Sequence, residues 1–136
     1  MGKQMILYKK RRHYKYTLVE SYSRVIDIRP DEKLGNNFLY LDTNGKIFIS
    51  EGYSWDGPSG PTIDTKNFMQ GSLVHDALYQ LIREQYLDFS YRKYADELLK
   101  EMCMDDDMSS IRAFFVYWAV RIFGASAAKP DTLKAP

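Results

Sequence analysis

Four polar residues carry the chemistry that this sequence offers. His75 and Asp76 are adjacent, and Tyr79 follows one helical turn after His75. Asp96 lies in the next segment of the chain in which apolar residues recur at helical spacing. A histidine can take a proton from water through one ring nitrogen while a carboxylate holds the other. We therefore expect His75 to be a general base that is oriented by Asp96 from a neighbouring antiparallel helix.

A loop rich in glycine and proline precedes these residues, from Gly52 to Pro61. Its glycines, Gly57 among them, allow unusual backbone angles that aim carbonyl groups inward. Asp76 should point about 100° away from His75 around the helix, toward this loop. Its carboxylate and the loop carbonyls form a hard-oxygen set that suits calcium. A metal and a base acting together would activate water against an ester carbonyl.

The same residues also have a structural interpretation. His75 bonded to Asp96 could simply tie two helices together as a buried polar pair. Tyr79, at helical spacing from His75, could be a packing residue. Exposure separates the alternatives, because a catalytic histidine must open to a cleft whereas a structural one can be sealed.

Three further residues are candidates for contact with a substrate: Asp56 and Ser59 in the loop, and Arg121 near the C-terminal end. Asp and Ser also cap turns through bonds from side chain to backbone, so both loop residues have a purely local role available. For Arg121 the alternative is pairing with an acidic side chain. Both possibilities stay open for each residue.

Length and composition indicate one folded domain. The chain has 136 residues, of which 45% are hydrophobic and 15% aromatic, so it can bury a core and is not expected to be disordered. The formal net charge of +1 gives no reason to expect a nucleic-acid partner. A local basic cluster over residues 9–15 is interpreted as a charged strand edge rather than a phosphate site. With the single Cys103 there is no internal disulfide, and the two His residues are too few for a structural zinc cage.

The apolar segments do not predict a membrane span. The N-terminal residues lack the features of a secretory signal, and the apolar run Ala113 to Val120 is far too short to cross a bilayer. That run is expected to be a core helix, with a position on a membrane surface as the alternative.

The first third of the chain should form strands. Residues 14–28 are rich in aromatic and β-branched side chains and predict one or two strands. Residues 38–41 and 47–49 flank Asn44-Gly45, which predicts a hairpin with a type I′ turn.

Three helices should follow. The first has a capping box at Asn67 and ends near Gln85, and the second starts at Ser90 and stops before the aspartates at 105–107. The third is capped by Ser109 or Ser110, is apolar almost all round and so should be largely buried, and closes at Gly124. The prediction is an α+β fold, with antiparallel hairpins or a sheet, then a loop and a three-helix layer. Residues 1–124 would form a single domain, and 125–136 a flexible tail.

The order of these parts resembles the phospholipase A2 superfamily over about residues 53–102. That superfamily combines a glycine-rich calcium loop, a helical His-Asp-x-x-Tyr and an Asp on the next antiparallel helix. The matching residues are Tyr53, Trp55, Gly57 and Gly60 in the loop, then His75, Asp76 and Tyr79. The interval from Gly57 to His75 also agrees with the superfamily's spacing.

The resemblance implies a role for each matching residue. His75 would be the general base, Asp96 its partner, and Tyr79 would brace the pair by a hydrogen bond toward Asp96. Asp76 would bind calcium through its side chain. The backbone carbonyls implied as further calcium ligands are those of Trp55, Gly57 and Ser59.

The chain departs from that superfamily in three respects. The half-cystine pairs that flank the His-Asp are absent, a loop glycine is replaced by Ser59, and the strand-rich first fifty residues have no counterpart.

Over its last two thirds the chain resembles a family of small phage and prophage proteins of uncharacterised function. The shared motifs are Gly52-Tyr53, Asp56-Gly57-Pro58-Ser59, His75-Asp76-Ala77-Leu78-Tyr79, Arg92-Lys93-Tyr94-Ala95-Asp96 and Arg121-Ile122-Phe123-Gly124. This resemblance implies a location in the host cytoplasm or the virion, without an activity.

Two functions therefore stand. The first is a phage-encoded hydrolase of the phospholipase A2 type that uses calcium, His75 and Asp96 on an ester, with lipid as a candidate substrate. The second is a non-enzymatic virion or tail component, or a protein that engages a phage or host partner, in which the same cluster is structural. The sequence leaves the substrate and the oligomeric state open.

Overall fold

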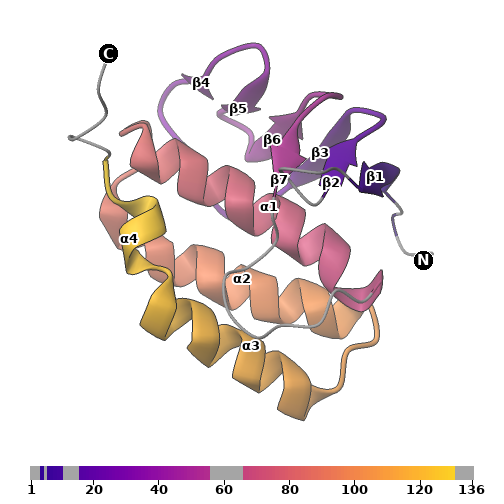
Figure 1. Ribbon diagram of the computed structural model, residues 1–136. Coiled ribbons are helices and arrows are strands. Elements are labelled where there is room, and N and C mark those ends of the chain that lie inside the picture. The colour runs from indigo at the N-terminus through magenta and orange to yellow at the C-terminus, as the bar shows by residue number, and fades with distance from the viewer. Residues whose placement is uncertain (1–3, 5, 11–15, 56–65, 131–136) are drawn as a thin grey trace. The chain divides into compact units, whose positions relative to one another are not determined.

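The computed structural model describes residues 4, 6–10, 16–55 and 66–130. The chain separates into two compact units, residues 1–57 and 58–136. Strands occupy the first unit and helices the second, which confirms the α+β class (Figure 1). Whether residues 1–124 behave as a single domain stays a prediction.

The strand unit contains two antiparallel sheets. One has the order β1-β2-β7 and the other β3-β6-β5-β4. The strands are β1 (Tyr8–Lys10), β2 (Tyr16–Leu18), β3 (Tyr22–Val25), β4 (Leu34–Gly35), β5 (Leu39–Leu41), β6 (Lys46–Ile49) and β7 (Ser54–Trp55). β1 lies at an edge of its sheet and contains Lys9 and Lys10, the described part of the basic segment, whereas residues 11–15 lie outside the described residues.

The predicted hairpin is confirmed, but its turn type is wrong. β5 pairs with β6 in the register Leu39↔Ile49 and Leu41↔Ile47. Gly45 N donates to Asp42 O at 2.9 Å, and Gly45 has a φ of 89°. Asn44 is not among the residues with positive φ, which a type I′ turn would require. A type I turn followed by a left-handed glycine fits instead, and the Asn44 side chain holds it by accepting from Lys46 N at 2.9 Å.

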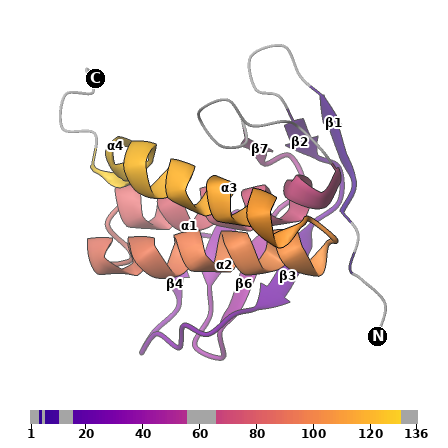
Figure 2. The same cartoon turned by 90° about the horizontal axis from the view of Figure 1, so that it is seen from below.

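The helical unit comprises α1 (Lys66–Arg83), the 3-10 turn η1 (Phe89–Tyr91), α2 (Arg92–Asp105), α3 (Ser110–Phe123) and α4 (Ala125–Ala128). α2 packs against both α1 and α3, and Figures 1 and 2 show these helices side by side. A buried apolar cluster joins them: Phe68 from α1, Leu99 and Cys103 from α2, Met108, and Ala113, Val116 and Val120 from α3.

The predicted helix boundaries hold at some ends and fail at others. Ser109 caps α3 by accepting from Arg112 N, and Gly124 follows its last residue, as expected. Asn67 is already inside α1, so it is not the N-cap. Ser90 does not cap α2 either, because Asp88 accepts from Ser90 N at 2.9 Å and starts η1 one turn earlier.

The expectation that α3 is largely buried is wrong. Ala113, Val116 and Val120 are its buried residues, whereas its other large apolar side chains are exposed. The exposed set is Ile111, Phe114, Phe115, Trp118, Ile122 and Phe123. The segment expected to be a flexible tail begins with the short helix α4, in which Ala128 is fully buried.

Candidate functional site

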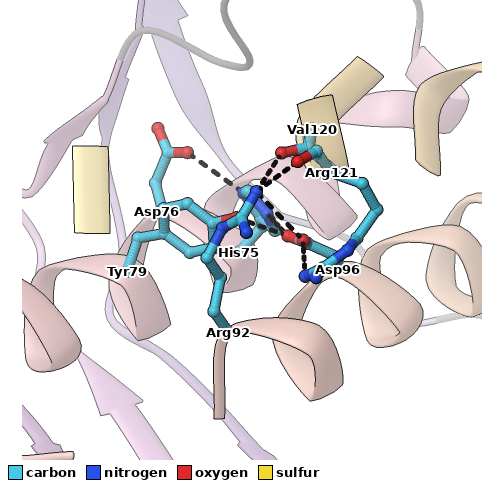
Figure 3. Close-up of polar contacts among 7 residues, drawn as sticks. All are labelled: His75, Asp76, Tyr79, Arg92, Asp96, Val120 and Arg121. Atoms are coloured by element: carbon cyan, nitrogen blue, oxygen red, sulfur yellow. Dashed lines mark hydrogen bonds and ion pairs between the residues drawn. The ribbon is translucent and has the colours of Figure 1, made fainter. Parts of the chain in front are cut away.

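A polar cluster inside the helical unit brings together five residues that the sequence singled out: His75, Asp76, Tyr79, Asp96 and Arg121 (Figure 3). α1 contributes Asp76 together with His75 and Tyr79, which share a face because they are four residues apart on a helix. α2 contributes Asp96, and α3 contributes Arg121.

Asp96 is the centre of this cluster and is fully buried. Its Oδ1 lies 2.7 Å from His75 Nε2 and accepts from the Tyr79 hydroxyl at 2.6 Å. Its Oδ2 accepts from Arg121 Nη1 at 2.8 Å. The predicted contacts of Asp96 with His75 and with Tyr79 are thus present. Arg121 has an acidic partner, the alternative foreseen for it, and its contact with substrate stays a prediction.

Arg92 is a member of the cluster to which the sequence motif gave no role. It is buried, and its Nη2 lies 4.0 Å from Asp96 Oδ2. Its Nε donates to the Tyr79 hydroxyl at 3.0 Å, and its Nη2 donates to the carbonyls of Val120 at 2.8 Å and Arg121 at 2.6 Å. The signal available in the sequence was the i, i+4 spacing of Arg92 and Asp96, which places them on one helix face.

The second nitrogen of His75 has a different environment. The residue is 5% exposed, and within the described part of the chain Nδ1 is buried without a hydrogen-bond partner. Asp76 Oδ1 lies 3.7 Å from Nδ1, beyond hydrogen-bond distance but within reach of an ion pair. The expectation that Asp76 points away from His75 is therefore wrong, because its side chain turns back toward the ring (Figure 3).

Burial and contacts within the cluster shift the pKa values of His75, Tyr79 and Asp96. Burial lowers the pKa of His75, but Asp76 and Asp96 outweigh burial, so this pKa is raised above 6.5. Burial likewise works against the ionised Asp96, yet the bonds from His75, Tyr79 and Arg121 leave its pKa below 3.8. Asp96 is therefore an anion at neutral pH. Burial and the adjacent Asp96 raise the pKa of the Tyr79 hydroxyl, which stays protonated and remains a donor.

The candidate loop residues are less informative. Asp56, Gly57 and Ser59 lie outside the described residues. Trp55 is buried in β7, where it pairs with Tyr16 and packs on that ring at 5.5 Å. Across the ranges that the structure describes, no group of three or more His, Cys, Asp or Glu residues is arranged to hold a metal. Calcium binding thus stays a prediction, with Asp76 as its described carboxylate.

Comparison of this chain with protein-family models, with curated proteins and with solved structures finds no match. The resemblances to the phage family and to the phospholipase A2 pattern therefore stay predictions. None of the helices described is long and apolar enough to cross a membrane.

Proposed function

We propose that this chain is a hydrolase that attacks an ester with water activated by His75 and Asp96. The observation that carries the proposal is the two-sided environment of the imidazole. Nε2 is held by the carboxylate at 2.7 Å, whereas Nδ1 has no hydrogen bond within the described residues. A base needs one nitrogen oriented and the other able to receive a proton. Nδ1 is buried, so the proposal also requires that water reaches this atom.

The proposed reaction follows from these two atoms. Nδ1 of neutral His75 accepts a proton from water as the water oxygen bonds to the ester carbonyl carbon. The bond to the alcohol oxygen then breaks, and the proton passes from Nδ1 to the leaving alcohol. Asp96 stays ionised throughout, keeps Nε2–H in place and stabilises the imidazolium that forms between the two steps.

Calcium assistance is a separate part of the proposal. When bound, calcium would polarise the ester carbonyl and stabilise the negative charge that develops on its oxygen. Asp76 is a suitable hard-oxygen ligand beside His75, but one carboxylate is too few for calcium. The backbone carbonyls of Trp55, Gly57 and Ser59 are the proposed additional ligands.

A lipid ester is the proposed substrate class, and α3 supports it. Ile111, Phe115, Trp118 and Ile122 recur at helical spacing and are 45% to 71% exposed, forming an outward apolar stripe. From Ser109 to Pro130 there is no acidic residue, whereas Arg112 and Lys129 are basic in addition to Arg121, which is paired with Asp96. An apolar helix face with basic neighbours suits binding to an anionic lipid surface.

Hydrolysis by purified variants tests the proposal. Short-chain phospholipid or aryl ester turnover should fall at least about 100-fold in His75→Ala and in Asp96→Asn. Glu97→Gln, which changes the exposed carboxylate next to Asp96, is the matched control and should keep full activity. Circular dichroism must show that each variant is folded. Undiminished turnover in both site variants would refute the proposal.

The alternative is a phage protein without enzymatic activity, such as a virion component or a protein that engages a host partner. The near-complete burial of His75 and the saturation of both Asp96 oxygens by donors from α1 and α3 favour a structural tie. In that case the wild-type protein hydrolyses no ester, and His75→Ala lowers the melting temperature sharply. Capture of a defined phage or host protein from infected cells would identify the partner.

A further inference from the structure

The Tyr79 hydroxyl is held by two side chains of α2. It donates to Asp96 Oδ1 at 2.6 Å and accepts from Arg92 Nε at 3.0 Å. The Tyr79 ring also packs on the His75 ring, with 4.2 Å between the two ring centroids. Because the side chain is buried and bonded on both sides, the hydroxyl cannot move without losing one of these contacts.

Gly124, the residue that follows α3, lies against the same hydroxyl. A Cβ atom built on Gly124 would lie 2.9 Å from the Tyr79 hydroxyl oxygen and 3.3 Å from Tyr79 Cε2. The same atom would lie 2.5 Å from the carbonyl oxygen of Val120. A methyl group at position 124 would therefore displace the backbone, the tyrosine or both. Glycine is the residue that lets a backbone approach a neighbour this closely.

Hydrogen bonds hold the backbone of Gly124 in this position. The carbonyl oxygen of Val120 accepts from Gly124 N at 2.9 Å and from Arg92 Nη2 at 2.8 Å. The arginine that donates to the Tyr79 hydroxyl is therefore also bonded to the carbonyl that holds Gly124. Moving either the hydroxyl or the glycine disturbs the same set of bonds.

Beyond Gly124 the chain returns to α1, and α4 packs against that helix (Figure 2). Arg83 Nη1 donates to the carbonyl of Ala127 at 3.0 Å, and Ala128 is fully buried. Arg83 comes four residues after Tyr79, so both lie on one face of α1. The turn between α3 and α4 is thus bound along the face of α1 that carries Tyr79.

We propose that Gly124 is a positioning residue. Because it has no side chain, the turn between α3 and α4 closes against Tyr79 and keeps the tyrosine hydroxyl on Asp96. The consequence for catalysis rests on the proposed function. The position of the hydroxyl does not, because it can be measured without a substrate.

The test is the NMR signal of the Tyr79 hydroxyl proton in the full-length protein. A buried hydroxyl that donates to a carboxylate should give a low-field signal that exchanges slowly with water. Tyr79→Phe identifies this signal by removing it. In Gly124→Ala the proton should exchange at least about tenfold faster, the effect of weakening one hydrogen bond to a charged group.

Ser126→Thr is the matched control, because it adds one methyl group at an exposed position two residues later. It should leave the hydroxyl signal unchanged. The proposal is overturned if Gly124→Ala changes the exchange rate no more than Ser126→Thr does. If Gly124→Ala does not fold, Arg83→Gln decides, since it removes the bond to Ala127 and leaves the glycine in place. Faster hydroxyl exchange in Arg83→Gln supports the proposal, and an unchanged rate overturns it.

Two further measurements separate this role from general stability and from the proposed function. The drop in melting temperature caused by Gly124→Ala should be smaller in a Tyr79→Phe background, which lacks the oxygen that the methyl group meets. Equal drops in the two backgrounds would overturn the contact. In ester hydrolysis Gly124→Ala should lower kcat several-fold at unchanged KM, because the hydroxyl acts on Asp96 and not on the substrate. If the wild type hydrolyses no ester while Gly124→Ala still speeds hydroxyl exchange, the proposed function fails and the positioning role stands.

Discussion

Asp96 carries a negative charge with no exposed surface, a placement that costs several kcal/mol unless donors surround the carboxylate. Here His75 and Tyr79 of α1 and Arg121 of α3 supply those donors, and Arg92 of α2 adds a second guanidinium at 4.0 Å, so groups from three helices compensate the charge. Removing the carboxylate would leave Arg92 and Arg121 facing each other without a counter-charge. The cluster is thus a point where one substitution affects α1, α2 and α3 together.

Asp96→Asn should therefore lower the free energy of unfolding by about 3 kcal/mol, the usual loss when one partner of a buried ion pair is removed. Urea denaturation followed by circular dichroism measures this loss. Glu97→Gln, on the exposed side of the same helix, should change it by less than about 0.5 kcal/mol. Equal effects of the two substitutions would contradict the structural importance of Asp96.

The pH dependence of stability provides a second prediction at this scale. The folded-state pKa of His75 is raised above its unfolded value of 6.5, so folding favours the protonated ring. This contribution is fully present below pH 6.5 and is lost as the pH rises through the folded-state pKa. The free energy of unfolding of wild type relative to His75→Gln should hence decrease between pH 6 and pH 9. A constant difference would show that the histidine is not stabilised in its charged form.

The sequence predicted some of the contacts in this cluster, and there is a physical reason why it did not predict the others. His75, Tyr79 and Asp96 were predictable because helical spacing and a single interhelical contact bring them together. The Arg121 contact depends on which face α3 turns to α2, and Arg92 bonds to carbonyls of α3. The i, i+4 spacing indicates only that Arg92 shares a helix face with Asp96. The bonds of Arg92 and Arg121 between α2 and α3 depend on how the two helices pack, which spacing along one helix does not report.

α3 is the element for which sequence and structure differ most. A helix that is apolar all round is usually buried all round, so its composition predicted a core position. In the structure a single face, with Val116 and Val120, packs into the helical core. The opposite face of α3 remains exposed. Whether a helix face is buried depends on the number of elements that pack against the helix, and the spacing of its apolar residues does not report that number.

Substitutions on the two faces of α3 should have opposite consequences. Val120→Ala removes buried volume and should cost about 1 to 2 kcal/mol, whereas Phe115→Ala, at 65% exposure, should change stability by less than about 0.5 kcal/mol. In sedimentation with anionic phospholipid vesicles, Phe115→Ala and Trp118→Ala should lower binding several-fold, and Val120→Ala should retain it. Unchanged binding in both stripe variants would refute a lipid role for α3.

For the whole molecule, composition and pattern predicted the fold class but not the activity. The described strands lie between Tyr8 and Trp55 and the described helices between Lys66 and Ala128, because β-branched and aromatic alternation gives way to helical spacing. The same properties do not separate a hydrolase from a structural phage protein. That choice depends on whether water and a ligand reach the buried His75, and binding measurements on the intact chain address it.

Calcium binding would stabilise the whole folded chain, which makes it measurable without a substrate. A ligand that binds the native state alone adds about 2.7 kcal/mol at one hundred times its Kd, so millimolar calcium should raise the melting temperature by several degrees. EDTA should reverse the increase, and Asp76→Asn should abolish it, because the substitution removes the proposed side-chain ligand. Asp105→Asn, at the exposed end of α2, is the control and should preserve the calcium effect. If calcium changes neither the melting temperature nor ester turnover, the calcium part of the proposal is refuted.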